Sequence, residues 1–333
     1  MSTRTVVTGG AGFIGSELVR QLVAAGHSVE VVDTLVNGRV ENLAGLDATR
    51  LTLHRVDVRD RARLDQVLRG TDVVFHLACL GVRHSLHAPV ENHEVNATGT
   101  LILLEAARAA DVARFVYVSS SEVYGTARTV PIAEDHPTRP CTVYGGSKLA
   151  GESYARAFFE SYGYPTVMVR PFNAYGPRCH HEGDSGEVIP KFLLRCLAGR
   201  PMVVFGDGLQ TRDFTFVADT ARGILESGFS DRCIGQTINL GSGREIAIAE
   251  LARAIAGVAG RPDAALVHDQ PRPGDVRRLC ADSSRAAELI DFAPRVGLEH
   301  GLQALLAWYR GLGVPIDALL EHDVIHNWES ART

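Results

Sequence analysis

The chain has 333 residues, which is more than a single hydrophobic core usually serves, so we expect two subdomains or one large α/β unit. Its 45% hydrophobic and 22% charged residues exclude a disordered or fibrous protein. The formal net charge of −5 and the pI near 6.2 argue against nucleic acid as a partner, because that partner needs a basic face.

Membrane insertion and secretion are not expected either. The sequence lacks an apolar run approaching the roughly eighteen residues of a membrane span. Thr8-Gly9-Gly10 interrupts the apolar N-terminal segment too early for a signal peptide. We therefore expect a cytoplasmic protein with no membrane partner.

The cysteines and the lysines give weaker evidence, on disulfides and metal sites and on chemically active residues respectively. The six cysteines stand at positions 79, 141, 179, 196, 233 and 280, without a Cys-x-x-Cys pair. This spacing predicts reduced thiols, with neither a disulfide framework nor a metal site. Lys148 and Lys191 are the only lysines among the 34 basic residues, which slightly favours a chemical role for each.

The first half of the chain alternates two kinds of pattern. Short β-branched, near-continuously apolar runs predict buried strands at 5–8, 28–33, 51–55, 72–75, 114–119 and 166–170. Helical patterns lie between them at 13–25, 62–68, 88–109 and 144–162. Strands and helices that alternate in this way form right-handed βαβ units, so the fold class is α/β with a doubly wound parallel sheet.

The rhythm changes after Arg170. Residues 171–187 are rich in Gly, Pro and polar side chains, and the later elements alternate less regularly. We therefore predict a first domain at 1–170 and a smaller, irregular substrate domain at 171–333. The segment near 216–235 is expected to return to the first domain, and residues 315–333 are expected to be an ordinary tail.

A glycine-rich segment, TGGAGFIG at 8–15, follows the first predicted strand directly and opens the first helix. Its glycines serve a tight turn, close approach to a pyrophosphate and close helix packing, while the helix N-terminus attracts phosphates. Asp33 ends the next strand, where a carboxylate meets ribose hydroxyls and repels a 2′-phosphate. The motif predicts a Rossmann-type domain that binds NAD rather than NADP.

Further strand ends belong to the same expected cofactor site. The Asp57 carboxylate can accept from an adenine amino group, although capping the next helix is nearly as good an explanation. His76 is expected to be a satisfied core histidine. The residues expected to bind the cofactor are Gly9, Gly12, Phe13, Ile14, Gly15, Asp33, Asp57, Val58, Leu77, Ala78, Tyr144 and Lys148.

A catalytic arrangement is predicted where the fifth strand ends. Tyr144 and Lys148 are four residues apart, which places them one turn apart on a helix face. An ammonium group there lowers the pKa of a phenol that otherwise titrates near 10. The phenolate can then take a proton from a hydroxyl while hydride leaves the same carbon. The Ser120 hydroxyl is placed to hydrogen-bond the oxygen of that substrate hydroxyl.

With these motifs the chain resembles the extended short-chain dehydrogenases/reductases, in the branch of nucleotide-sugar epimerases and dehydratases. The resemblance covers nearly the whole chain. It implies that Ser120, Tyr144 and Lys148 oxidise a sugar at C4. It also implies a nucleotide-diphosphate sugar as substrate and a homodimer formed through helices 88–109 and 144–162.

The resemblance extends to the expected substrate residues. Arg212 and Arg272 match two arginines that clamp a diphosphate, which suits bidentate guanidinium contacts. Segment 204–208 resembles the base-binding strand, and Asn173 matches a residue on the diphosphate or sugar. The residues expected to bind the substrate are Arg83, Asn173, Val204, Arg212, Arg272 and Asp275.

The residues after Ser120 bear on the reaction. Glu122 stands where related 4,6-dehydratases carry the base that removes the C5 proton, but Ser121 replaces the usual acidic residue. The resemblance therefore narrowly favours a 4,6-dehydratase acting on a UDP- or dTDP-hexose. A UDP-glucose 4-epimerase type of reaction and a UDP-glucuronate decarboxylase remain alternatives.

Two other classes of protein fit the sequence less well. A non-catalytic dinucleotide sensor tends to lose the Ser, Tyr or Lys, and all three are present. An NADP-dependent reductase of small carbonyls leaves Arg212 and Arg272 without a function. In segment 179–184 the residue types suit a metal, but adjacent positions cannot all face one ion. We expect there a loop over the sugar, with His180 or His181 touching a hydroxyl.

Overall fold

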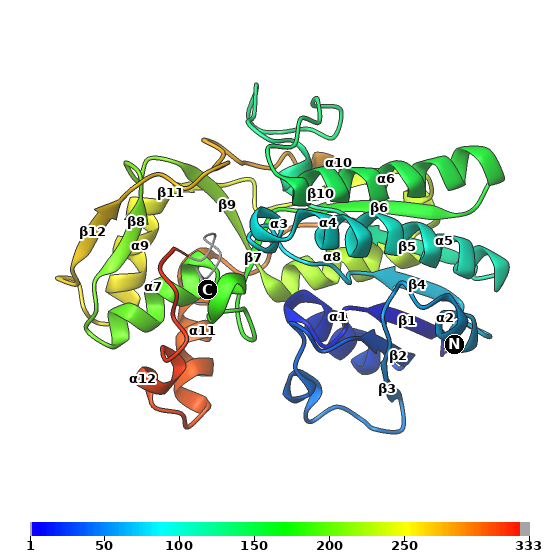
Figure 1. Ribbon diagram of the computed structural model, residues 1–333, viewed down its shortest axis with the longest axis horizontal. Helices are drawn as coiled ribbons and strands as arrows, with labels where there is room; N and C mark the ends of the chain where they lie inside the picture. The colour runs from blue at the N-terminus through cyan, green and yellow to red at the C-terminus, as the bar shows by residue number, and fades with distance from the viewer. Residues whose placement is uncertain (1, 327–333) are drawn as a thin grey trace.

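The computed structural model describes residues 2–326 and has two lobes (Figure 1). The larger lobe is built on a seven-stranded sheet in the order β10-β6-β5-β4-β1-β2-β3, with every neighbouring pair parallel. This confirms the predicted α/β class and Rossmann-type sheet. The strands are β1 (Arg4–Thr8), β2 (Ser28–Asp33), β3 (Leu51–Arg55), β4 (Val73–His76), β5 (Arg114–Val118), β6 (Thr166–Pro171) and β10 (Thr237–Leu240).

Helices cover both faces of this sheet because its strands are apolar on both sides. Val7 and Phe75 face the helices α1 (Phe13–Ala24), α8 (Val217–Phe229) and α10 (Ser284–Ile290). Their neighbours Val6 and Val74 pack on the other face, against a second helical layer. That layer consists of α2 (Arg61–Val67), α5 (Gly99–Ala109) and α6 (Val143–Tyr162).

Two local predictions were wrong. Strand β3 is only partly buried, because it is the edge strand of the sheet and pairs with β2 alone. The continuous helix expected over 88–109 is divided into α4 (Pro89–His93), a π-helical turn η2 (Glu94–Thr98) and α5. The π turn accompanies buried Asn92 and Asn96, whose side chains bond the backbone at Leu80.

The smaller lobe holds two short sheets and a helical core. One sheet has the order β11-β9-β7, and in the other β12 pairs with β8 in parallel. Its strands are β7 (Asn173–Tyr175), β8 (Met202–Phe205), β9 (Thr211–Phe216), β11 (Glu245–Ala247) and β12 (Leu266–Asp269). Its helices are α7 (Val188–Leu197), α9 (Ile248–Val258), α11 (Leu298–Gly311) and α12 (Ile316–Leu319).

The chain returns to the large sheet after entering the smaller lobe. Helix α8 packs along α1, and β10 adds the seventh strand beside β6. The expected returning segment 216–235 includes α8 but stops short of β10. Short connecting elements complete the chain: η1 (Val40–Leu43), α3 (His84–His87), η3 (Ser121–Val123), η4 (Gly183–Ser185) and η5 (Asp231–Cys233).

The strand order indicates that a ligand binds at the edge formed by the carboxyl ends of the strands. The order reverses beside β1, which has β2 and β4 as neighbours, and ligands of such sheets bind outside the carboxyl ends at this point. Within residues 2–326, none of the helices combines the length and apolar character that crossing a bilayer requires.

Candidate active site

A pocket of about 680 Å³ lies at the carboxyl ends of the parallel strands and extends into the smaller lobe. It brings together residues from the whole length of the chain. All the predicted catalytic and cofactor residues line it, as do five of the six predicted substrate residues: Arg83, Asn173, Arg212, Arg272 and Asp275.

The glycines at the start of α1 allow the turn, the helix and the segment after β4 to pack closely together. Gly9 has φ +69°, and a Cβ there would lie 2.8 Å from the Ala78 nitrogen. A Cβ on Gly15 would lie 2.1 Å from the Gly9 carbonyl oxygen, so the helix can approach the turn only without a side chain. Gly12 caps α1, whose N-terminus opens into the pocket. These features fit a dinucleotide pyrophosphate.

Asp33 lies at the end of β2 with its carboxylate oriented by two backbone donors. One oxygen accepts from the Ala11 N–H at 3.0 Å and the other from the Leu35 N–H at 2.8 Å. Burial raises the pKa of this carboxyl despite these bonds. Its position in the pocket suits a ribose diol, which can donate to the remaining lone pairs.

Asp57 and Val58 form the pocket beyond Asp33. The Asp57 carboxylate pairs with the Arg59 guanidinium at 2.7 Å and accepts the Arg59 N–H at 2.8 Å. Asp60, not Asp57, caps α2, since its side chain accepts from the Arg63 N–H. The capping explanation for Asp57 was therefore wrong.

His76 is a satisfied core residue, as expected from the sequence. It is 1% exposed, and its two ring nitrogens lie 2.7 and 2.8 Å from the hydroxyls of Thr8 and Thr100. Burial lowers its pKa to about 3, so the ring is neutral at physiological pH. Leu77 and Ala78, which follow it, line the pocket.

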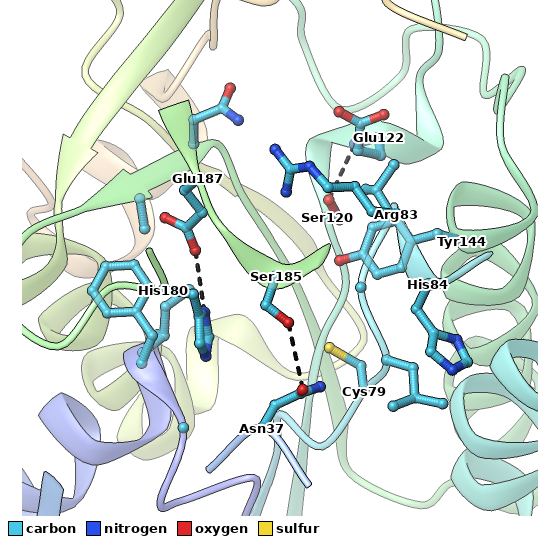
Figure 2. Close-up of a pocket in the computed structure, with 18 of the residues that line it drawn as sticks. Asn37, Cys79, Arg83, His84, Ser120, Glu122, Tyr144, His180, Ser185 and Glu187 are labelled. Atoms are coloured by element: carbon cyan, nitrogen blue, oxygen red, sulfur yellow. Dashed lines mark hydrogen bonds and ion pairs between the residues drawn. The ribbon is translucent and has the colours of Figure 1, made fainter. Parts of the chain in front are cut away.

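Tyr144 and Lys148 lie one turn apart at the start of α6, which begins after a Thr142 cap that accepts from the Gly145 N–H. Figure 2 shows the Tyr144 hydroxyl pointing into the pocket, with Ser120 on the same wall. The ammonium group of Lys148 donates to the Val118 carbonyl at 2.5 Å, at the end of β5. The structure thus brings the three residues of the predicted triad together.

The surroundings of Tyr144 within the protein do not favour a phenolate. Burial raises the pKa of Tyr144, and a nearby Ser120 hydroxyl lowers it by less. Burial also lowers the pKa of Lys148, which is 3% exposed. The expected depression of the Tyr144 pKa therefore stays a prediction, and it requires the positive charge of an oxidised nicotinamide beside the phenol.

Glu122 lines the same pocket, in the short helix η3 that follows Ser120. Its N–H donates to the Ser120 hydroxyl at 3.2 Å, which fixes the two residues relative to one another (Figure 2). Burial raises the pKa of the Glu122 carboxyl, and the positive charges of Arg212 and Arg272 lower it by less. Ser121, between them, is 3% exposed and also reaches the pocket.

Arg212 and Arg272 converge on one carboxylate. Both guanidinium groups pair with the same Asp275 oxygen, Arg272 at 2.7 Å. Arg212 also donates to the Val276 carbonyl at 2.7 Å, and it is 6% exposed. Asp275 therefore holds two arginines at the pocket edge, where their remaining donors suit a diphosphate.

Of the predicted substrate residues Asn173 and Val204, only Asn173 lines the pocket. Asn173 lines the pocket from β7, and its buried side-chain oxygen has no hydrogen-bond partner among the described residues. Val204 was a wrong assignment. Its side chain is 0% exposed in the core of the smaller lobe, because alternate residues of β8 face opposite ways. Val203 and Phe205 line the pocket in its place.

Other pocket residues had little or no signal in the sequence. Cys79 follows β4 and directs its sulfur into the pocket (Figure 2). Lys191 and Arg195 line the pocket from α7, and the scarcity of lysine was the only hint for Lys191. Ile325 lines it too, although residues 315–333 were expected to be an ordinary tail.

Segment 179–184 forms part of a loop between the lobes. His180 lines the pocket beside Glu187, while His181 is 8% exposed and packs edge-on against Tyr309. His181 is thus not available to a sugar. No group of three metal-ligating side chains is found in the part of the chain that the structure describes.

The same loop reaches the cofactor side of the pocket. Glu182 pairs with Arg39 at 2.5 Å, and the Ser185 hydroxyl donates to Asn37 at 3.4 Å (Figure 2). Both partners belong to the loop after β2, next to Asp33. These contacts join the two lobes across the pocket.

Comparison with known proteins gives the family. The model of the GDP-mannose 4,6 dehydratase family matches residues 6–305. A UDP-glucose 4-epimerase of Mycolicibacterium smegmatis is 40% identical over 312 residues, covering 92% of this chain and 98% of that protein. The chain belongs to the extended short-chain dehydrogenases/reductases. Within them it falls in the branch of NAD-dependent nucleotide-sugar epimerases and dehydratases, as the sequence motifs predicted.

Relatives in this family carry different activities. A dTDP-glucose 4,6-dehydratase of Streptomyces griseus is 36% identical and is covered over 94% of its length, with 93% of this chain matched. A UDP-N-acetyl-α-D-glucosaminuronate decarboxylase of Bacillus cytotoxicus is 33% identical, with coverage of 98% and 93% respectively. Family membership therefore does not distinguish among these reactions.

Solved structures of the family share the whole fold. A Thermotoga maritima UDP-glucose 4-epimerase with UDP-glucose has a TM-score of 0.88 at 31% identity, covering 94% of this chain and all of that one. A Streptomyces venezuelae dTDP-glucose 4,6-dehydratase with NAD bound has a TM-score of 0.87 at 33% identity, covering 93% and 97%.

Proposed function

We propose that the protein binds NAD and a nucleotide-diphosphate hexose together and oxidises the sugar at C4. We favour, narrowly, a 4,6-dehydratase that acts on a UDP- or dTDP-hexose. The observation that supports this most is the carboxyl of Glu122, which shares a pocket with Tyr144 and has a raised pKa. A pocket carboxyl with a raised pKa is a candidate for general acid-base catalysis.

NAD is the cofactor, and the glycine turn, the α1 N-terminus and Asp33 are the groups that hold it. It supplies a site for reversible hydride transfer. Leu77 and Ala78 line the pocket where they would help to hold the cofactor, and Asp33 would discriminate against a 2′-phosphate by charge.

In the proposed reaction Tyr144 accepts the proton of the C4 hydroxyl while hydride leaves C4. Ser120 bonds the same oxygen and keeps it directed at the phenol. Lys148 is held by the Val118 carbonyl, so its charge is fixed next to the reacting groups. These three residues act as one proton-transfer unit.

Glu122 acts after C4 becomes a ketone, because the ketone acidifies the proton on C5. The Glu122 carboxylate removes that proton, and the C6 hydroxyl departs as water. Ser121 cannot serve as a strong acid, so the proton gained by Glu122 is the one returned to the leaving oxygen. The hydride taken from C4 would then be returned to C6, while C5 regains a proton, so that the net change is the loss of one water and the cofactor ends oxidised. The raised pKa of Glu122 suits its double role, since it makes the protonated carboxyl easier to form.

The diphosphate is assigned to the arginine pair. Arg212 and Arg272 supply bidentate donors, and Asp275 keeps both oriented before the substrate arrives. Asn173 offers a side-chain oxygen, without a partner within residues 2–326, to a sugar or ribose hydroxyl. Arg83 lies on the same side as Glu122 (Figure 2), where it can meet the sugar or its phosphate.

A UDP-glucose 4-epimerase type of reaction is the second candidate, because the Mycolicibacterium smegmatis relative at 40% identity is such an enzyme. In that reaction Glu122 has no proton to transfer. A decarboxylase is a third, by similarity to the Bacillus cytotoxicus protein.

Product mass separates these reactions. The protein is incubated with UDP-, dTDP- and GDP-hexoses and with UDP-glucuronate, and products are analysed by mass spectrometry. We expect loss of water from one of the UDP- or dTDP-hexoses. An unchanged mass with inverted C4 supports the epimerase, and loss of carbon dioxide supports the decarboxylase; either result contradicts dehydration.

The assembly and location are proposals as well. We infer a homodimer formed through α4, α5 and α6, where exposed apolar side chains occur. A cytoplasmic location stays a prediction from the sequence.

A further inference from the structure

The last described residues, 321–326, are not a detached tail. In Figure 1 this red segment runs back from α12 beside α7, toward the middle of the molecule. It brings Ile325 to the pocket wall. The Ile325 side chain is 38% exposed there.

The first part of the segment is fixed by charge. The Asp323 carboxylate, with 3% of its side chain exposed, pairs with Lys191 at 3.3 Å and with Arg195 at 2.6 Å. The Lys191 ammonium also donates to the Val324 carbonyl. A buried carboxylate with two cations is costly to break on one side, so this end of the segment is well anchored.

The other end is fixed to the short parallel sheet. The His326 ring lies 2.8 Å from the Asp269 carboxylate, and its centroid is 6.2 Å from that of Phe205. Asp269 and Phe205 are register partners at the ends of β12 and β8. Ile325 therefore lies between two anchored residues, Asp323 and His326. The pocket residue Phe205 packs near His326.

The pocket at this end has the character of a site for a planar, partly apolar group. Val203, Phe205 and Ile248 line it together with Ile325. Gln210 lines it too and donates to the Phe205 carbonyl at 2.8 Å, which leaves its buried amide oxygen without a partner among the described residues. A nucleobase with a ring N–H matches apolar faces plus one acceptor.

We infer that residues 322–326 form a C-terminal strap that completes the base-binding end of the pocket, with Ile325 packing on the base of the nucleotide substrate. The inference rests on the proposed function and deepens it. The strap determines nucleotide affinity through the base and not through the phosphates.

The test uses two strap variants of the full-length protein. Ile325→Ala removes the apolar contact, and Asp323→Asn weakens the ion pairs with Lys191 and Arg195 without changing the shape of the side chain. Asp317→Asn is the matched control, because Asp317 pairs with exposed Arg200 at 2.9 Å outside the pocket. Binding of UDP, dTDP, inorganic pyrophosphate and NAD is measured by calorimetry, and thermal unfolding checks that each variant is folded.

We expect both strap variants to bind UDP or dTDP about tenfold more weakly, the loss of roughly 1.4 kcal/mol that one apolar contact supplies. Pyrophosphate and NAD should bind as in the wild type, and the control should match the wild type throughout. Since Ile325 is partly exposed, its truncation leaves the fold intact even if Asp323→Asn does not fold.

Other outcomes overturn the inference. UDP and dTDP binding within about twofold of the wild type in a folded Ile325→Ala protein excludes a contact with the base. If the variants bind UDP and pyrophosphate more weakly to the same extent, the strap acts on the phosphates and not on the base. If the wild type binds neither nucleotide at millimolar concentration, the proposed function itself fails along with the strap.

Discussion

The pKa of the Glu122 carboxyl is determined by the surroundings of that residue in the fold. As a glutamate near the end of a strand it has an ordinary carboxyl, but burial in the pocket raises its pKa against the influence of nearby arginines. The position of Glu122 after Ser120 could be read from the sequence. The direction of its pKa shift could not, because burial sets that direction and the pocket that buries Glu122 is built from distant parts of the chain.

Replacing Glu122 tests its role in proton transfer. In Glu122→Gln we expect dehydration to slow by about 10²–10⁴-fold, because the base at C5 is lost, while C4 oxidation continues. Reduced nicotinamide absorbance and product mass report the two steps. Glu187→Gln is the control, since that carboxyl lies in the same pocket beside His180. Dehydration above a tenth of the wild-type rate in Glu122→Gln contradicts the assignment.

Glu122 should also affect stability. Its pKa is raised in the folded protein, so the folded state binds the proton more tightly and the ionised form is destabilising above the raised pKa. Glu122→Gln should therefore raise the free energy of unfolding at pH 8 by about 0.5–2 kcal/mol. Thermal unfolding at several pH values should show this gain shrinking as the pH falls toward 5. A lower melting temperature at pH 8 contradicts the expected sign.

The strand β8 illustrates the limit of sequence reasoning at this scale. The strand borders the pocket, but Val203 and Phe205 line it, whereas the predicted Val204 faces the core. In a strand, a shift of one residue exchanges the two faces, and an apolar run without alternation does not reveal which face is which.

Among the elements, the broken helix at 88–109 was the least predictable. Its sequence continues the helical pattern through Glu94–Thr98, and the π turn depends on long-range bonds to Leu80. Asn96 accepts the Leu80 N–H at 2.8 Å and donates to the Leu80 carbonyl at 2.9 Å. It thereby supports the wall of the pocket that carries Cys79.

Asn96→Ala should destabilise the fold, because the buried Leu80 N–H loses its acceptor. We expect a decrease of about 1–3 kcal/mol in the free energy of unfolding, measured by denaturant titration. Glu94→Ala, an exposed change in the same turn, should stay within about 0.5 kcal/mol of the wild type. Equal effects of the two substitutions would show that the bonds of Asn96 add no particular stability.

For the whole molecule, the alternation of strands and helices was enough to predict the sheet, since its strands other than the edge strand β3 are largely buried. It was not enough to predict that β10 joins the sheet or that residues 321–326 reach the pocket. Both depend on contacts between segments far apart in the sequence, such as Asp323 with Lys191 and Arg195.

The proposed dimer gives a prediction at this scale. Leu101 on α5 is 40% exposed and Tyr162 at the end of α6 is 58% exposed, on helices that pack side by side. We expect light scattering to give twice the 35.9 kDa of one chain, and Leu101→Arg to give a single chain. Val267→Arg, at a similarly exposed apolar position on β12, should remain dimeric. A wild-type monomer contradicts the proposed assembly.

The role of Tyr144 is central to the proposed function, and one measurement tests it most directly. Tyr144→Phe and the wild type are loaded with NAD and mixed with the hexose nucleotide that the wild type converts, and reduced nicotinamide is followed by its absorbance in a single turnover. We predict a transient in the wild type and none in Tyr144→Phe, with NAD and UDP bound equally by both. An undiminished transient in Tyr144→Phe would contradict proton transfer through this phenol.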